Sequence, residues 1–228
     1  MFISYFIFKE NLGIFNIVLI SLVLVTFINS MMVLEEKETE TQIQKSFLEK
    51  HGDIISAFAA MFIGMTLAMS LAFIILPEQV VEKMFYEQIR EINIIQGKFT
   101  FGSQFMDIVA NNLSVLMLSF LLSFLIGTGA ILILSWNASV LAAAIGMITK
   151  SLGGWHGFPL AVLTFLPHGV FEITAYFVGA ISGGLISACV IRKRAKLGFI
   201  LKDALSLLFI AVIMLIIGGL IETFIIVI

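Results

Sequence analysis

Residues 167–191 read PHGVFEITAYFVGAISGGLISACVI, and this stretch decides the fold. It exceeds the roughly 20 apolar residues that cross a hydrocarbon core. His168 and Glu172 are its only side chains that carry charge near neutral pH. A charged group at a helix centre costs roughly 2.5–3.5 kcal/mol on insertion scales, and residues four apart share one helix face. We therefore predict a membrane helix in which these two side chains lower each other's cost.

The composition of the whole chain supports a membrane protein. The chain has 228 residues, of which 60% are hydrophobic and only 12% are charged, with a mean hydropathy of +1.12. Soluble domains carry about twice that charged fraction. The apolar runs are continuous rather than alternating, which argues against a β-barrel. We predict an all-α, polytopic membrane helical bundle that forms a single domain over residues 1–228.

The apolar runs predict five to six membrane spans. The expected spans are residues 12–33, 53–76, 107–134, 167–191 and 199–228, with a broken or re-entrant element at residues 138–166. Pro77 ends the second span, because helices rarely continue through proline. Lys150, Gly153 and Gly154 interrupt the element at residues 138–166. Non-helical backbone at membrane depth requires cover by protein or by a water-filled cavity.

Residues 78–96 have a different pattern. Val81, Phe85, Ile89 and Ile92 recur at helical spacing with charged residues between them, which predicts an amphipathic helix. Such a helix lies in the membrane interface or packs on the surface of its own protein. Both alternatives remain open at the level of sequence.

The loop at residues 192–202 orients the chain. It holds the strongest basic cluster, formed by Arg192, Lys193, Arg194, Lys196 and Lys202. By the positive-inside rule this loop is cytoplasmic, in a multi-pass protein of the cell membrane. His168 and Glu172 then begin their span on the external side. The N-terminus is external if the element at residues 138–166 crosses fully, and cytoplasmic if that element is re-entrant.

The pair formed by His168 and Glu172 has three interpretations: a proton relay, half of a metal site, or a structural ion pair. An isolated His-x-x-x-Glu lacks the second histidine of a zinc protease helix, and Cys189 is the only cysteine in the chain. We therefore predict no metal site and no cofactor. We favour a structural hydrogen-bonded cluster that ties the helix to its neighbours, with a transport or proton pathway as the alternative.

A second polar group opens the predicted span at residues 107–134. Asp107 and Asn111 are four apart and share a face, and Asn112 follows directly. Polar side chains of this kind hydrogen-bond across membrane helices. We expect Asp107, Asn111 and Asn112 to act as interhelical contacts and to join the cluster around residues 167–172.

Several of these residues form a recognisable pattern. Asn111, Asn112, Pro167, His168, Gly169 and Glu172 match an Asn-Asn start of one span followed by Pro-His-Gly-x-x-Glu at the start of a later one. The chain therefore resembles the stage II sporulation protein M family over roughly residues 102–228. Ala138 stands where that family often has glycine. The resemblance implies a membrane protein whose sporulating relative works in a complex with peptidoglycan-remodelling proteins.

Two functions follow as expectations. The first is a non-enzymatic membrane scaffold or complex subunit in envelope or membrane remodelling, with residues 78–96 as the membrane-shaping or partner-binding surface. Its partners would be the lipid bilayer and other membrane or envelope proteins, with no nucleic acid, and its exposed apolar surfaces are compatible with a homo-oligomer. The alternative is a transporter or channel component that uses a polar cavity near His168 and Glu172, because discontinuous membrane helices often build substrate sites. An intramembrane enzyme is the weakest reading, because no Ser/Lys dyad or paired-histidine motif is evident.

Overall fold

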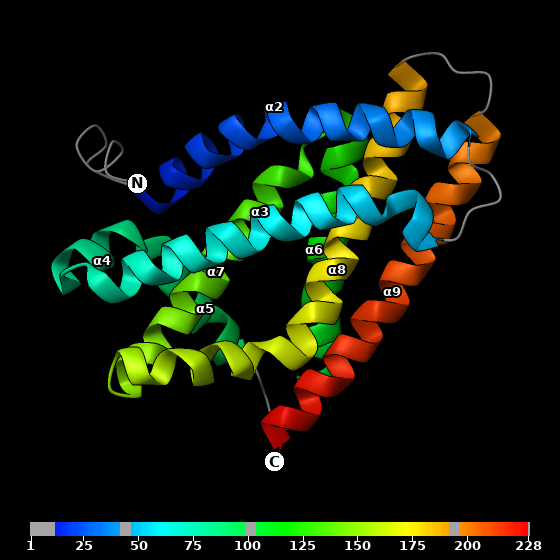
Figure 1. Cartoon of the computed structure of the whole chain (residues 1–228). Helices are drawn as coiled ribbons and strands as arrows, with labels where there is room; N and C mark the ends of the chain where they lie inside the picture. Colours follow the sequence, from blue (N-terminus) through cyan, green and yellow to red (C-terminus); the bar gives the residue numbers. More distant parts are fainter. Residues whose placement is uncertain (1–11, 42–46, 99–103, 192–196, 228) are drawn as a thin grey trace.

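The computed structural model describes residues 12–41, 47–98, 104–191 and 197–227, and its regular elements there are all helices (Figure 1). In chain order they are α2 (Leu12–Thr41), α3 (Phe47–Ile75), α4 (Glu78–Met84), α5 (Tyr86–Lys98), α6 (Gln104–Ile126), α7 (Ala130–Ser151), the 3-10 turn η1 (Trp155–Gly157), α8 (Phe158–Ile191) and α9 (Leu197–Val227). Six of these helices, α2, α3 and α6 to α9, are long and apolar enough to cross a membrane. The predicted all-α, polytopic helical bundle is confirmed.

The predicted span at residues 107–134 ends too late. α6 stops at Ile126 and α7 begins at Ala130, so the chain turns inside the apolar run. Gly127 has φ +76°, a left-handed conformation that glycine adopts without steric cost. A Cβ atom on Gly129 would overlap the carbonyl oxygen of Leu122. Two glycines therefore make a turn that hydropathy alone does not reveal.

The predicted broken element at residues 138–166 is divided between two full helices. Its first part completes α7, and its last part begins α8. Between them the chain turns at Gly153 and Gly154, both with φ +88°. Pro167 lies inside α8 rather than at the start of a span. A proline in a helix interior removes one backbone hydrogen bond and bends the helix, and Figure 1 shows α8 changing direction in this region.

The predicted amphipathic segment forms two short helices, α4 and α5, that meet at Phe85. Its apolar side chains pack on the protein itself. Val81, Phe85 and Ile92 are buried in a cluster with residues of α2, α3 and α7, and Ile89 packs against that cluster half-buried. Of the two alternatives left open by the sequence, the structure therefore has the apolar face packed on neighbouring helices.

Helix α8 is the centre of the bundle. Within its most apolar window 78% of residues are buried, against at most 50% in any of the other five helices. Gly179 and Gly183 let α8 approach α6 closely, because a Cβ at either position would overlap Leu116 or Phe120 of α6. Phe177 stacks on Phe58 of α3 with ring centroids 5.7 Å apart. The core therefore forms around α8.

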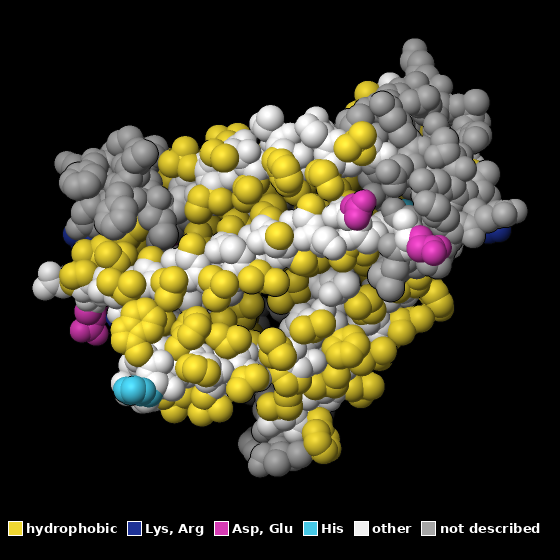
Figure 2. Space-filling view, in the orientation of Figure 1, with side chains coloured by type: hydrophobic (Ala, Val, Ile, Leu, Met, Phe, Trp, Pro, Cys, Tyr) yellow, Lys and Arg dark blue, Asp and Glu magenta, His cyan; other side chains and the backbone are white. Residues whose placement is uncertain are grey.

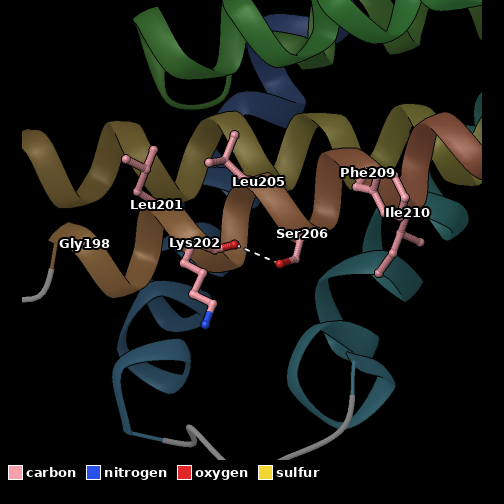
Figure 3. A pocket seen from close by; sticks show the side chains of 7 residues that line it. All are labelled: Gly198, Leu201, Lys202, Leu205, Ser206, Phe209 and Ile210. Carbon is pink, nitrogen blue, oxygen red and sulfur yellow. Dashed lines mark hydrogen bonds between the residues drawn. The ribbon is translucent and has the colours of Figure 1, made fainter.

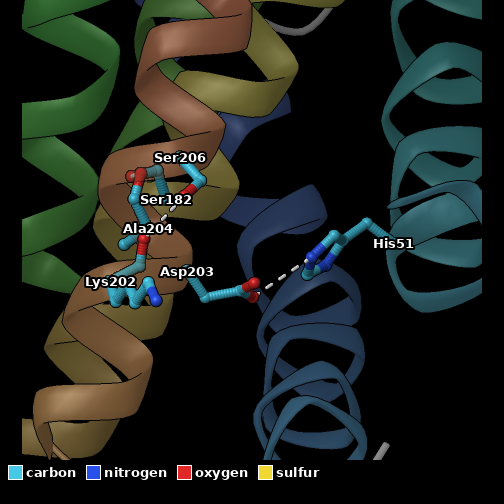
Figure 4. Close-up of polar contacts among 6 residues, drawn as sticks. All are labelled: His51, Ser182, Lys202, Asp203, Ala204 and Ser206. Atoms are coloured by element: carbon cyan, nitrogen blue, oxygen red, sulfur yellow. Dashed lines mark hydrogen bonds and ion pairs between the residues drawn. The ribbon is translucent and has the colours of Figure 1, made fainter. Parts of the chain in front are cut away.

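Polar contacts also join α9 to α3 and to α8 near the start of α9 (Figure 4). His51 of α3 lies 3.4 Å from the carboxylate of Asp203 on α9, and Ser182 donates a 2.8 Å hydrogen bond to the Ala204 carbonyl. The face seen in Figure 2 is largely covered by hydrophobic side chains and shows few acidic ones. Such a surface, on helices long and apolar enough to cross a membrane, fits contact with lipid.

Candidate polar pocket

A cavity of about 510 Å³ lies among α3, α5, α6, α7, α8 and α9, near the kink in α8. We call it the polar pocket. Its polar side chains come from four helices and are Asn111, Asn112, Asn137, His168, Glu172, Tyr176 and Glu222. Asn111 is exposed, so the pocket reaches the surface of the protein there. An accumulation of polar groups beside lipid-facing helices marks a functional region.

Two helix faces meet in this pocket. His168 and Glu172 are four apart on α8, and Gly218 and Glu222 are four apart on α9, so each pair shares one face. Gly218 allows the two faces to touch, because a Cβ atom there would lie 2.8 Å from Cγ of Glu172 and 3.4 Å from the carbonyl oxygen of His168. The absence of a side chain at Gly218 thus brings the two glutamates together.

The three titratable side chains lie close to one another. A ring nitrogen of His168 and one carboxylate oxygen each from Glu172 and Glu222 are within 4.8 Å of one another. His168 and Glu172 are each only 8% exposed, and Glu222 is half-buried. Nδ1 of His168 and Oε1 of Glu172 are buried without a hydrogen-bond partner. Buried polar atoms are usually paired. These two are among eleven buried side-chain atoms without a hydrogen-bond partner in the described residues, and they are distinguished by belonging to residues of one titratable group.

Asn112 links the Glu172 carboxylate to neighbouring polar side chains. Its amide is within hydrogen-bond reach of Glu172. Its Oδ1 accepts a 2.9 Å hydrogen bond from the Tyr176 hydroxyl and a weaker 3.5 Å contact from the Asn111 amide. The ring of Phe165 meets the His168 ring edge-on, with centroids 6.2 Å apart. The pocket is thus bordered on α6 by hydrogen-bonded asparagine side chains and on α8 by the aromatic ring of Phe165.

The structure brings together most of the residues that the sequence predicts for this cluster. His168, Gly169, Glu172, Asn111 and Asn112 all line the pocket. Pro167 is exposed and lies inside α8, where it affects the shape of the helix. Asp107 lies half-buried in the first turn of α6 and does not line the pocket.

Three members of the pocket were not assigned to it by sequence reasoning: Glu222, Tyr176 and Asn137. The sequence does single out Glu222, because it is a charged residue in the last apolar run, where a buried charge needs a partner. Its partner is on another helix and cannot be identified from spacing. Tyr176 follows Glu172 by four residues and therefore shares its helix face, which is a usable signal.

A second, larger pocket is lined by fewer polar side chains. A groove of about 610 Å³ runs along the outer face of α9 (Figure 3). Its polar side chains are Lys202 and Ser206, and the Ser206 hydroxyl already donates to the Lys202 carbonyl at 2.9 Å. The remaining lining is apolar or glycine. We therefore locate the candidate functional site in the polar pocket.

The arrangement of the polar pocket favours a positively charged ligand. Two carboxyl groups so close together, away from bulk water, require a counter-charge or a shared proton. The pocket offers carboxylate, amide and hydroxyl oxygens together with an imidazole nitrogen. These groups can replace the water shell of a small cation.

Comparison with known proteins places the chain in a family. The model of a family described as Stage II sporulation protein M matches residues 53–225, which is more than half of the chain. The matched region contains every residue that lines the polar pocket. No curated protein and no solved structure matches the chain.

Proposed function

This chain belongs to the stage II sporulation protein M family, and on that premise we propose that it is a non-enzymatic transport or channel component that binds a small cation in the polar pocket. The observation that carries this proposal is the group of His168, Glu172 and Glu222, with two buried polar atoms that lack partners.

The backbone around the pocket supports this function. α8 is bent at Pro167, next to His168, and the preceding connection turns through two glycines. Bent or interrupted membrane helices often border substrate sites in transporters, because they can change their angle around a fixed site. A pocket bordered by a bent helix is therefore suited to open and close around a bound ion.

The orientation belongs to the same proposal. With residues 192–202 on the cytoplasmic side of the cell membrane, the C-terminal end of α9 and the pocket beside it lie toward the external side. Lys202 is exposed near the start of α9, whereas Arg192, Lys193, Arg194 and Lys196 lie outside the described residues. A cation would then enter from outside, attracted by the two glutamates.

Flux through liposomes tests the proposal. The purified full chain is reconstituted, and H⁺, Na⁺, K⁺, Mg²⁺, Mn²⁺ and Zn²⁺ are tested one at a time with an entrapped reporter dye. We expect flux of at least one cation above protein-free liposomes, and a loss of that flux in Glu172→Gln and His168→Ala. Glu82→Gln is the matched control, because Glu82 is an exposed carboxylate on α4. Absence of flux for every cation, or undiminished flux in both pocket variants, would reject the proposal.

A membrane scaffold is the second candidate, and the outer face of α4 and α5 favours it. Glu82, Lys83 and Arg90 are exposed there, opposite the buried apolar face. A mixed-charge face on a short helix pair is suited to a protein partner. Deleting the segment would disturb the core, so charge reversal is the sharper test.

The scaffold candidate predicts that crosslinking in native membranes captures a defined protein partner with the wild-type chain. Lys83→Glu with Arg90→Glu should lose that partner, while Glu172→Gln should keep it. If the charge-reversed protein retains every crosslinked partner, this face is not the docking surface.

A further inference from the structure

We propose that His168, Glu172 and Glu222 form a binding site for a divalent first-row transition cation, of the class of Zn²⁺ and Mn²⁺. The inference rests on the proposed function for the choice of pocket and deepens it by naming the class of ion. It departs from the sequence-level expectation of no metal site, because Glu222 supplies the third ligand that a lone His-x-x-x-Glu lacks.

The geometry is close to that of a coordination shell. The three donor atoms lie within 4.8 Å of one another. Nitrogen and carboxylate ligands bind such metals at roughly 2.0–2.2 Å, so opposite ligands of one ion are at most about 4.4 Å apart. The separations in the group exceed that limit by no more than about 0.4 Å, and rotation about the glutamate side-chain bonds can bring the donor atoms closer.

Burial supplies the second, independent observation. His168 and Glu172 are each more than nine-tenths buried, and each keeps one polar atom without a partner. The same two residues belong to the ligand group. A metal ion would complete their missing interactions in one step and would balance the charge of the two glutamates.

The surrounding residues resemble the outer shell of a metal site. Asn112 fixes the Glu172 carboxylate and is itself held by the Tyr176 hydroxyl at 2.9 Å. Partners of this kind orient ligating carboxylates and raise metal affinity. The imidazole suits Zn²⁺ and the two carboxylates also suit Mn²⁺, whereas Ca²⁺ and Mg²⁺ prefer oxygen ligands alone.

Direct metal binding tests the inference. The purified full chain in lipid nanodiscs is stripped with a chelator and titrated with Zn²⁺ or Mn²⁺ alone, and bound metal is counted by elemental analysis. We expect about one ion per chain, and Co²⁺ should give an absorption spectrum of a site with nitrogen and oxygen ligands. Mg²⁺ and Ca²⁺ in excess should compete weakly. A wild-type protein that binds none of the three transition ions overturns the inference.

Isosteric variants locate the ion. Glu172→Gln and Glu222→Gln should each abolish stoichiometric binding, and Asn112→Leu should weaken it by roughly 10–100-fold as an outer-shell change. Glu82→Gln should bind as wild type does. Folding is checked by size-exclusion chromatography, and Glu222→Gln is the variant best tolerated because Glu222 is only half-buried. Full binding in both glutamine variants places the ion elsewhere and overturns the inference.

The outcomes separate this inference from the proposed function. Stoichiometric binding without flux in liposomes keeps the metal site and rejects transport. Flux of another cation by a chain that binds no transition metal keeps transport and rejects the metal site.

Discussion

The replacement of Gly183 by alanine tests how the centre of the bundle is built. A Cβ atom at Gly183 would overlap the carbonyl oxygen of Phe120 and lie 2.9 Å from the backbone nitrogen of Phe124. Favourable contacts between carbon atoms need about 3.5–4.0 Å. Since the obstructing atoms are backbone, no rotamer change can relieve the overlap, and α6 and α8 must move apart.

The size of the effect follows from that separation. A gap of 0.5–1 Å loses about a quarter to a half of each dispersion contact across the interface. Overpacking of a core generally costs roughly 1–3 kcal/mol, and we expect Gly183→Ala to lie at the upper end because backbone blocks the added methyl group. Gly64→Ala is the matched control, since nothing lies within 4 Å of a Cβ there. It should gain up to about 1 kcal/mol from helix propensity.

The assay is the free energy of unfolding of both variants in lipid bicelles, measured by steric trapping or by titration with a denaturing detergent. Gly183→Ala should unfold more easily than wild type, and Gly64→Ala no more easily. If Gly183→Ala is as stable as wild type while Gly64→Ala behaves as expected, α6 and α8 are not in backbone contact, and the reasoning from close approach fails.

Three further predictions concern polar contacts. Glu172→Leu should lower the free energy of unfolding by about 1–3 kcal/mol, because the amide of Asn112 loses a buried acceptor; equal thermal stability of variant and wild type would contradict it. Tyr176→Phe should lower it by about 1 kcal/mol through loss of the 2.9 Å hydrogen bond to Asn112, and an unchanged melting temperature would show that this bond contributes nothing. For His51→Ala and Asp203→Ala we expect a coupling energy of roughly 0.5–3 kcal/mol in a double-mutant cycle, whereas strict additivity would mean that the two side chains do not interact.

The sequence predicted one half of the polar pocket. His168 and Glu172 share a helix face by their spacing alone, and they stand out because charge is rare in such an apolar run. Asn112 was expected to make contacts between helices, and it does so through Tyr176. Glu222 could not be placed, because its contact with Glu172 depends on how α9 crosses α8 at Gly218.

The helix ends show a similar division. Hydropathy located the apolar segments but missed the turn at Gly127. The residues on both sides of that turn are apolar, so the hydropathy of the segment does not fall there. Hydropathy also assigned Pro167 to a helix start, where proline is most easily accepted. The packing around α8 tolerates the proline inside the helix, and the cost is a bend.

The sequence by itself determined that this protein is a helical membrane bundle, because apolar length and the scarcity of charge act locally and need no knowledge of neighbours. It also determined that His168 and Glu172 share one helix face. Only the tertiary structure decided that Glu222 completes their group and that the apolar face of α4 and α5 is covered by other helices. Those features depend on which helices touch and at what angle. Small residues such as Gly218 and Gly183 allow two helices to approach closely, but the sequence does not show which helix will pack against them.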